Sequence, residues 1–120
     1  MKESTELCHL FRKDGIVLKD LSCLEVVEVL FDDGSHYERS VKRCKVCGAW
    51  FLYDFIEYVN YAGGDDEIYC TFVQADSREN ALRMHESNKP IREFFPAICD
   101  DNGQSIYVML ERDEYEDDED

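Results

Sequence analysis

The pattern of apolar and polar residues changes its period at about residue 76. Before that point, apolar runs are bounded by turn-forming residues, which predicts strands over 24–31, 36–43, 49–61 and 68–75. The run 49–61 is apolar and aromatic on both of its period-two faces, which is typical of a central strand covered on both sides. A helix is the competing interpretation of so continuous a run, but its aromatic enrichment favours a strand.

Two Asp–Gly pairs predict hairpins, because a tight two-residue turn requires positive φ angles. Asp33–Gly34 joins the predicted strands 24–31 and 36–43. The earlier pair, Asp14–Gly15, separates the short apolar runs 7–12 and 16–18, so we expect a first, smaller hairpin there with Cys8 in its first strand.

After residue 76 the spacing becomes helical. Asp76 or Ser77, followed by Glu79, resembles a capping box and predicts a helix that runs to about His85. Apolar residues at i, i+3, i+4 and i+7 within 91–98 predict a second helix, although a proline inside this run would kink or shorten it.

A last strand is expected over 104–110. The predicted fold class is therefore α+β: an antiparallel β-meander of five to six strands with a cysteine-rich knuckle, one or two C-terminal helices and a final strand.

The six cysteines bear on both compartment and chemistry. The N-terminus has no apolar signal region and no stretch is long enough to cross a bilayer, so we expect a cytoplasmic protein without a membrane partner. In a reducing compartment, metal ligands and buried thiols are favoured over three disulfides.

Cys44 and Cys47 form a C-x-x-C pair followed by Gly48, and two thiolates at this spacing can bind one metal ion. A two-residue loop in the hairpin before them would place Cys23 opposite Cys44, with Cα atoms about 4.5–5.5 Å apart. A one-residue bulge would shift this pairing without separating the sulfurs.

The fourth ligand is then expected from the first strand, either Cys8 or its neighbour His9, since alternating side chains allow only one of the two to face the site. Cys70 and His36 lie too far along their strands, and Cys99 has no predicted place. The sequence thus predicts a closed, structural Zn²⁺ site; its ligands are Cys8, Cys23, Cys44 and Cys47. Unmetallated buried thiols and a redox-active C-x-x-C pair remain as alternatives.

The C-x-x-C-G turn at Cys44, Cys47 and Gly48 resembles the knuckle of zinc-ribbon proteins, in which such a turn joins two strands. That resemblance implies a structural zinc ion closed by a second cysteine pair. The present sequence departs from the pattern because it has no second C-x-x-C, so the remaining ligands must meet through the fold.

The chain has a net charge of −15, which bears on the kind of partner that it would bind. Eight of its last ten residues are acidic. We expect residues 1–110 to form a single zinc-stapled α+β domain and residues 111–120 to form a disordered acidic tail. An acidic body repels phosphate, which argues against nucleic acid as the main ligand and favours a basic protein partner.

The sequence has no P-loop, Rossmann fingerprint, nucleophile elbow or H-E-x-x-H motif, so we do not expect an enzyme. In size, charge and lack of catalytic motifs the chain is similar to small bacterial immunity proteins, a resemblance that implies inhibition of a basic toxin such as a nuclease. The alternative is a zinc-ribbon-like nucleic-acid or transcription-machinery adaptor that uses the basic stretch 39–45.

Overall fold

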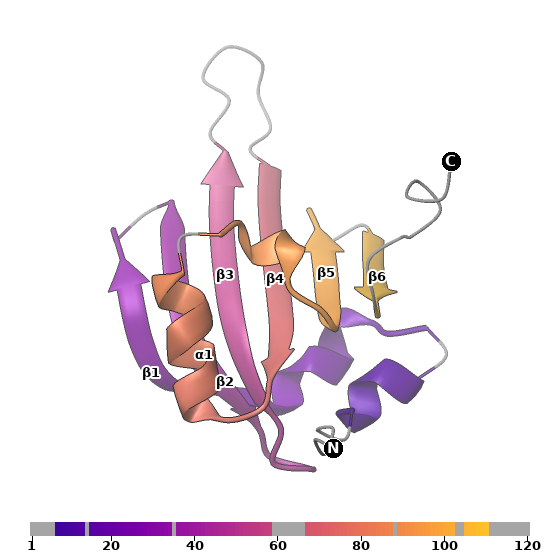
Figure 1. Cartoon of the computed structure of the whole chain (residues 1–120). Helices are drawn as coiled ribbons and strands as arrows, with labels where there is room; N and C mark the ends of the chain where they lie inside the picture. The colour runs from indigo at the N-terminus through magenta and orange to yellow at the C-terminus, as the bar shows by residue number, and fades with distance from the viewer. Residues whose placement is uncertain are drawn as a thin grey trace, which may run out of the picture.

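The computed structural model describes residues 7–13, 15–34, 36–58, 67–87, 89–102 and 105–110, which form a six-stranded antiparallel sheet (Figure 1). Every strand pairs with the next one in sequence, so the sheet is a simple meander and the predicted α+β meander is confirmed. The strands are β1 (Leu24–Asp32), β2 (Tyr37–Cys44), β3 (Trp50–Tyr58), β4 (Glu67–Ala75), β5 (Ala97–Asp101) and β6 (Ser105–Met109).

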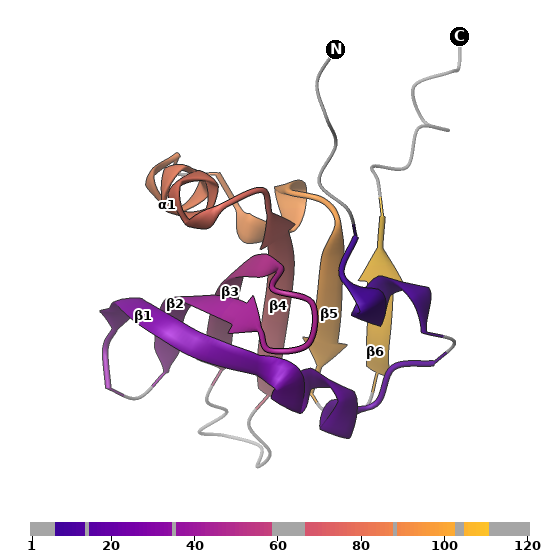
Figure 2. The same cartoon turned by 90° about the horizontal axis from the view of Figure 1, so that it is seen from below.

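The sheet is covered on both faces (Figure 2). On β3 and β4, Phe51 and Phe72 point to one face, while Leu52 and Val73 point to the other, as the period-two pattern of these runs requires. The first face, called here the cysteine face, is covered by the N-terminal segment (residues 7–13 and 15–23). The second, called the helix face, is covered by α1 (Arg78–Glu86) and by the 3₁₀ helix η3 (Ile91–Glu93).

The expected first hairpin does not form: the N-terminal segment folds into two 3₁₀ helices, η1 (His9–Arg12) and η2 (Leu18–Cys23). In η1, Leu10 and Phe11 are consecutive and both buried, which a strand with alternating side chains cannot achieve against a single face. A 3₁₀ turn can. Asp14 lies outside the described residues.

The two-residue loop expected at Asp33–Gly34 is wrong, because Asp32 pairs with Glu38 and not with Ser35. Two irregularities in β1, one between Val26 and Glu28 and one between Val29 and Phe31, reduce this offset along the strand pair. At the other end of the pair the register therefore differs from the expected one by a single residue, and Leu24 lies opposite Cys44 in place of Cys23. Cys23 still lies beside the end of β2, since its carbonyl accepts a hydrogen bond of 2.9 Å from the Lys45 N–H.

Helix α1 begins close to where the sequence predicts. Ser77 caps it by accepting from the Asn80 N–H at 3.0 Å, and the Asn80 side chain accepts in return from the Asp76 N–H at 2.9 Å. The reciprocal partner is therefore Asn80 and not Glu79.

The second predicted helix is wrong. Only η3 forms, and the chain then enters β5, where Ile98 lies opposite Phe72. Pro96 explains the change, because it lacks a backbone donor and disfavours the helical conformation of the preceding residue. Within the described residues, none of the helices has the length and apolar character that crossing a bilayer requires.

Candidate metal centre

Four side chains from two segments of the chain lie close together on the cysteine face. Cys8 and His9 come from the N-terminal segment, and Cys44 and Cys47 come from the knuckle, residues 44–48, between β2 and β3. One potential ligand atom from each residue lies within 4.8 Å of the others. This group is close enough to bind a single metal ion.

The knuckle is held by its own backbone. The Gly48 N–H donates to the Cys44 carbonyl and the Cys44 N–H donates to the Ala49 carbonyl, both at 2.9 Å. Gly48 has a φ of +81°, in the left-handed region that glycine adopts at little cost. The Val46 N–H donates to the Cys44 sulfur at 3.4 Å, so a backbone dipole stabilises negative charge on that atom.

The N-terminal segment is positioned by one buried hydrogen bond and by apolar packing. The Cys8 N–H donates to Gln74 Oε1 on β4 at 2.9 Å, and the Phe11 N–H donates to the Cys8 carbonyl at 3.0 Å, which starts η1. Phe11 packs against Phe51, with ring centroids 6.2 Å apart.

Because Cys8 and His9 lie at the start of a 3₁₀ turn, both contribute to the four-residue group. The expectation that only one of these neighbours could face the site is therefore wrong. That expectation holds only for a strand, in which neighbouring side chains point to opposite faces. The consecutive apolar pair after His9 was the signal in the sequence that could have indicated a helical turn.

Three of the distances between the four donor atoms lie close to those that one tetrahedral ion would impose. Cys8 Sγ lies 3.4 Å from Cys47 Sγ, and His9 Nδ1 lies 3.7 Å from Cys8 Sγ and 3.9 Å from Cys44 Sγ. With Zn–S near 2.3 Å and Zn–N near 2.0 Å, a tetrahedron has S···S edges of about 3.8 Å and N···S edges of about 3.5 Å. These three separations are close to the edges of such a tetrahedron, so the donor set is compatible with a zinc ion.

Cys23 lies beside this group and adds a fifth donor. Its sulfur is 3.6 Å from Cys44 Sγ, and its thiol donates to the Asp20 carbonyl at 3.4 Å. We call the five residues Cys8, His9, Cys23, Cys44 and Cys47 the donor cluster. All four cysteines expected from the sequence lie in it, and His9 and Cys23 are rival fourth ligands beside the other three.

The thiols of the donor cluster differ in acidity. Burial raises the pKa of Cys8, and burial raises the pKa of Cys23 to about 11. Burial acts in the same direction on Cys44 and Cys47, yet hydrogen bonds from backbone amides to Cys44 and from His9 to Cys47 lower the pKa of both. The C-x-x-C pair therefore ionises more readily than Cys8 and Cys23, and the thiolate is the form that binds a metal.

The other cysteines and His36 lie elsewhere. Cys70 is on β4 opposite Phe55 and accepts a hydrogen bond of 3.5 Å from the Tyr53 hydroxyl. Cys99 is buried in β5. His36 is exposed at the far end of the β1–β2 hairpin, 3.8 Å from a Glu57 carboxylate oxygen.

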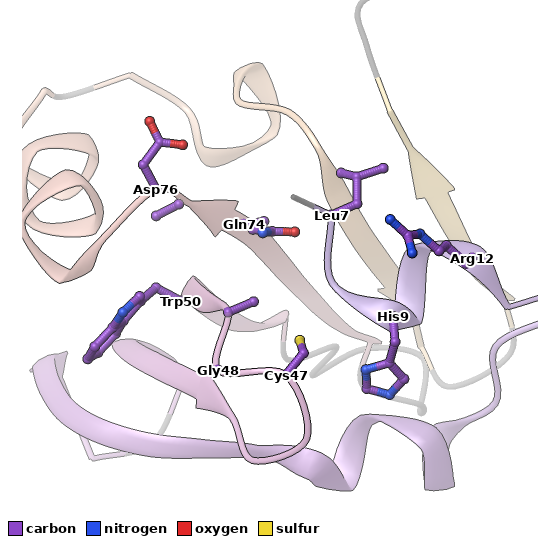
Figure 3. Close-up of a pocket in the computed structure, with 10 residues that line it drawn as sticks. Leu7, His9, Arg12, Cys47, Gly48, Trp50, Gln74 and Asp76 are labelled. Atoms are coloured by element: carbon purple, nitrogen blue, oxygen red, sulfur yellow. The ribbon is translucent and has the colours of Figure 1, made fainter. Parts of the chain in front are cut away.

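A hollow of about 330 Å³ opens beside the donor cluster, between the knuckle and the N-terminal segment (Figure 3). Its lining includes His9, Cys47, Trp50 and Gln74. Cys47 is exposed, whereas Cys8 and Cys44 are buried. Solvent therefore reaches the donor cluster from the Cys47 side.

No family model, curated protein or solved structure matches this chain.

Proposed function

We propose that this chain is a small non-enzymatic module that binds a basic protein partner and whose N-terminal segment is held on the sheet by a structural Zn²⁺ ion. The observation that carries the proposal is the convergence of Cys8, His9, Cys44 and Cys47 within 4.8 Å. Thiolate and imidazole donors select zinc among the common divalent ions, and four such donors leave no coordination position open for a substrate.

The role of the metal follows from the elements it would join. Cys44 and Cys47 belong to the knuckle, which has its own backbone hydrogen bonds, whereas Cys8 and His9 belong to a segment of two short 3₁₀ helices. Short 3₁₀ helices have little stability of their own. A metal ion at this point would fix that segment over Phe51 and Phe72, whose side chains form the floor of the cysteine face.

Support for a protein partner comes from charge and from an exposed edge strand. β1 is at one edge of the sheet and exposes Val26 (51%), Val29 (51%) and Phe31 (47%) to solvent. Apolar side chains on an unpaired edge favour the addition of an extended segment from another chain. The net charge of −15 selects for a basic segment and accelerates its association. A basic toxin, as bound by immunity proteins, has this chemistry.

The nucleic-acid alternative loses support because the basic stretch 39–45 is engaged within the fold. The contacts are Arg39 with Asp54 (2.7 Å), Lys42 over the Tyr53 ring (4.1 Å), Arg43 over the Trp50 ring (4.6 Å) and Lys45 with Glu25 (3.4 Å). Phosphate binding would have to compete with each of these contacts.

Two measurements test the proposal. Elemental analysis of the native protein should find about one zinc per chain, as four ligands bind one ion. Association with a panel of basic nuclease domains should include a partner whose association rate falls as salt increases. A native protein without zinc would contradict the proposed structural metal site. Association that does not depend on salt for any protein of the panel would contradict charge-driven binding of a basic partner.

The binding surface has its own matched pair of variants. Val29→Glu on β1 should weaken partner binding by at least tenfold, whereas Leu18→Glu, at a similarly exposed position on η2, should not. Equal effects would show that β1 is not the surface. Retention of single- or double-stranded nucleic acid on a filter at low salt would instead favour the adaptor.

A further inference from the structure

The donor cluster contains two pairs of cysteine sulfurs in contact. Cys8 Sγ lies 3.4 Å from Cys47 Sγ, and Cys23 Sγ lies 3.6 Å from Cys44 Sγ. Each pair joins the N-terminal segment to the knuckle region, and no cysteine belongs to both pairs. The four thiols could therefore form two separate disulfide bonds, in addition to serving as metal ligands.

We propose that the donor cluster is a site of reversible oxidation, at which a peroxide converts these pairs into the disulfides Cys8–Cys47 and Cys23–Cys44. The inference goes beyond the proposed function, because it requires the four thiols but neither zinc nor a partner. Its consequence is that the N-terminal segment stays attached to the sheet when the metal is lost under oxidising conditions.

The geometry needs only small movements. A disulfide bond is about 2.05 Å long, so each pair of sulfurs must approach by roughly 1.5 Å, which side-chain rotation can supply. The backbones are already adjacent at Cys23, whose carbonyl accepts from the Lys45 N–H at 2.9 Å. The backbone of Cys8 is held by the hydrogen bond from its N–H to Gln74 Oε1 at 2.9 Å.

The two thiols of each pair differ in their exposure to solvent. Cys47 is exposed and Cys23 is half-buried, whereas their partners Cys8 and Cys44 are buried. Figure 3 shows the Cys47 side chain beside the hollow between the knuckle and the N-terminal segment. Each pair thus offers one thiol that a small peroxide can reach and one sheltered thiol that can resolve the product.

The chemistry balances with peroxide alone. At the accessible thiol, hydrogen peroxide transfers an OH group to sulfur, giving a sulfenic acid and one water. The buried thiol then attacks that sulfur, the S–S bond forms, and the OH leaves as a second water with the remaining thiol proton. One peroxide is reduced for each disulfide formed, so the complete cluster consumes two.

The competing product is a disulfide between Cys44 and Cys47 within the knuckle. That bond would close a single turn and leave the N-terminal segment unlinked, so the two outcomes differ in topology as well as in mass-spectrometric fragments. It is the outcome expected of a redox-active C-x-x-C motif, and it separates such a motif from the cross-link proposed here.

The test uses the full chain, reduced, treated with a zinc chelator and then with two equivalents of hydrogen peroxide. The intact mass should fall by four hydrogens, and digestion without reductant should yield peptides linked as Cys8–Cys47 and Cys23–Cys44. Cys70 and Cys99 should remain open to alkylation after unfolding. A Cys44–Cys47 link, links to Cys70 or Cys99, or no disulfide at all would overturn the inference.

Variants and stability complete the experiment. Cys23→Ser should keep only the Cys8–Cys47 link, and the matched Cys70→Ser should keep both links. The oxidised, metal-free protein should unfold at a higher temperature than the reduced, metal-free protein, and dithiothreitol should reverse the gain. An equal or lower midpoint would show that the bonds do not hold the segment. Zinc content measured on the native preparation tests the proposed function separately.

Discussion

The two faces of the sheet are covered by elements of very different strength. On the helix face, α1 has a side-chain cap at Ser77 and buries Ala81 and Met84, so its own hydrogen bonds and apolar contacts hold it. On the cysteine face, η1 and η2 contain four and six residues, and neither has the i→i−4 bonds of an α-helix. The cross-links proposed at the donor cluster would supply the stability that these short helices lack.

The largest expected effect separates the cysteines of the donor cluster from the others. Cys44→Ser should release the metal and lower the free energy of unfolding by at least ~3 kcal/mol, because binding a structural zinc contributes roughly 10–16 kcal/mol in small zinc domains. Cys70→Ser, made outside the cluster, should leave the metal content unchanged. Elemental analysis and urea unfolding measure both. Equal metal content in the two variants would contradict the assigned ligands.

Substitutions at neighbouring core positions should then distinguish the faces. Leu52→Ala, on the helix face, should cost about 2–5 kcal/mol through the cavity it leaves. Phe51→Ala, on the cysteine face, should cost about 3–5 kcal/mol and also weaken metal binding, because Phe51 supports Phe11 beneath the N-terminal segment. Competition with a chromogenic chelator measures affinity. Equal metal affinity in the two variants would show that the faces are not separate units.

The sequence predicts those elements whose conformation depends on neighbouring residues better than those that depend on distant parts of the chain. The strands β1 to β4 and β6 were predictable because the apolar and polar pattern of a strand is a local signal, and the Ser77 cap was predictable for the same reason. The strand β5 was not, because its first residues belong to an apolar stripe of helical spacing. The conformation of the N-terminal segment was not, since its helices form only where Leu10 and Phe11 can both enter a core built by later residues. Pro96 opposes a helix over 91–98, and its effect on the backbone outweighs the apolar stripe.

The candidate site divides in the same way. Cys44 and Cys47 follow from spacing alone, and Cys23 follows from strand pairing even though the register is shifted by one residue. Cys8 was reached by elimination. The simultaneous approach of His9 was out of reach, because it depends on a 3₁₀ turn where a strand was assumed.

A smaller effect should mark the end of the helix face. Ser77→Ala removes the acceptor for the Asn80 N–H and should lower the free energy of unfolding by about 1 kcal/mol. Metal content should not change, because α1 packs on the opposite face from the donor cluster. Ser105→Ala, at an exposed strand position, is the control. A loss of zinc in Ser77→Ala would show that the two faces are coupled.

The smallest effect concerns Lys42, whose ammonium lies on the cysteine face over the Tyr53 ring at 4.1 Å. Burial lowers the pKa of Lys42 below its ordinary value of 10.5. Below this lowered pKa the folded state bears the full cost of the buried charge. As pH rises from there towards 10.5, the folded protein loses the proton first, so the cost disappears and the contribution of Lys42 becomes more favourable.

Lys42→Met should therefore raise the free energy of unfolding at neutral pH by on the order of 1 kcal/mol or less, since the lost contact with Tyr53 offsets part of the gain. The advantage over the natural protein should shrink as pH approaches 10.5, whereas Lys42→Arg, which stays charged, should show no such advantage. Urea unfolding at several alkaline pH values measures the difference. An advantage that stays constant with pH would mean that apolar packing, and not the buried charge, distinguishes the variants.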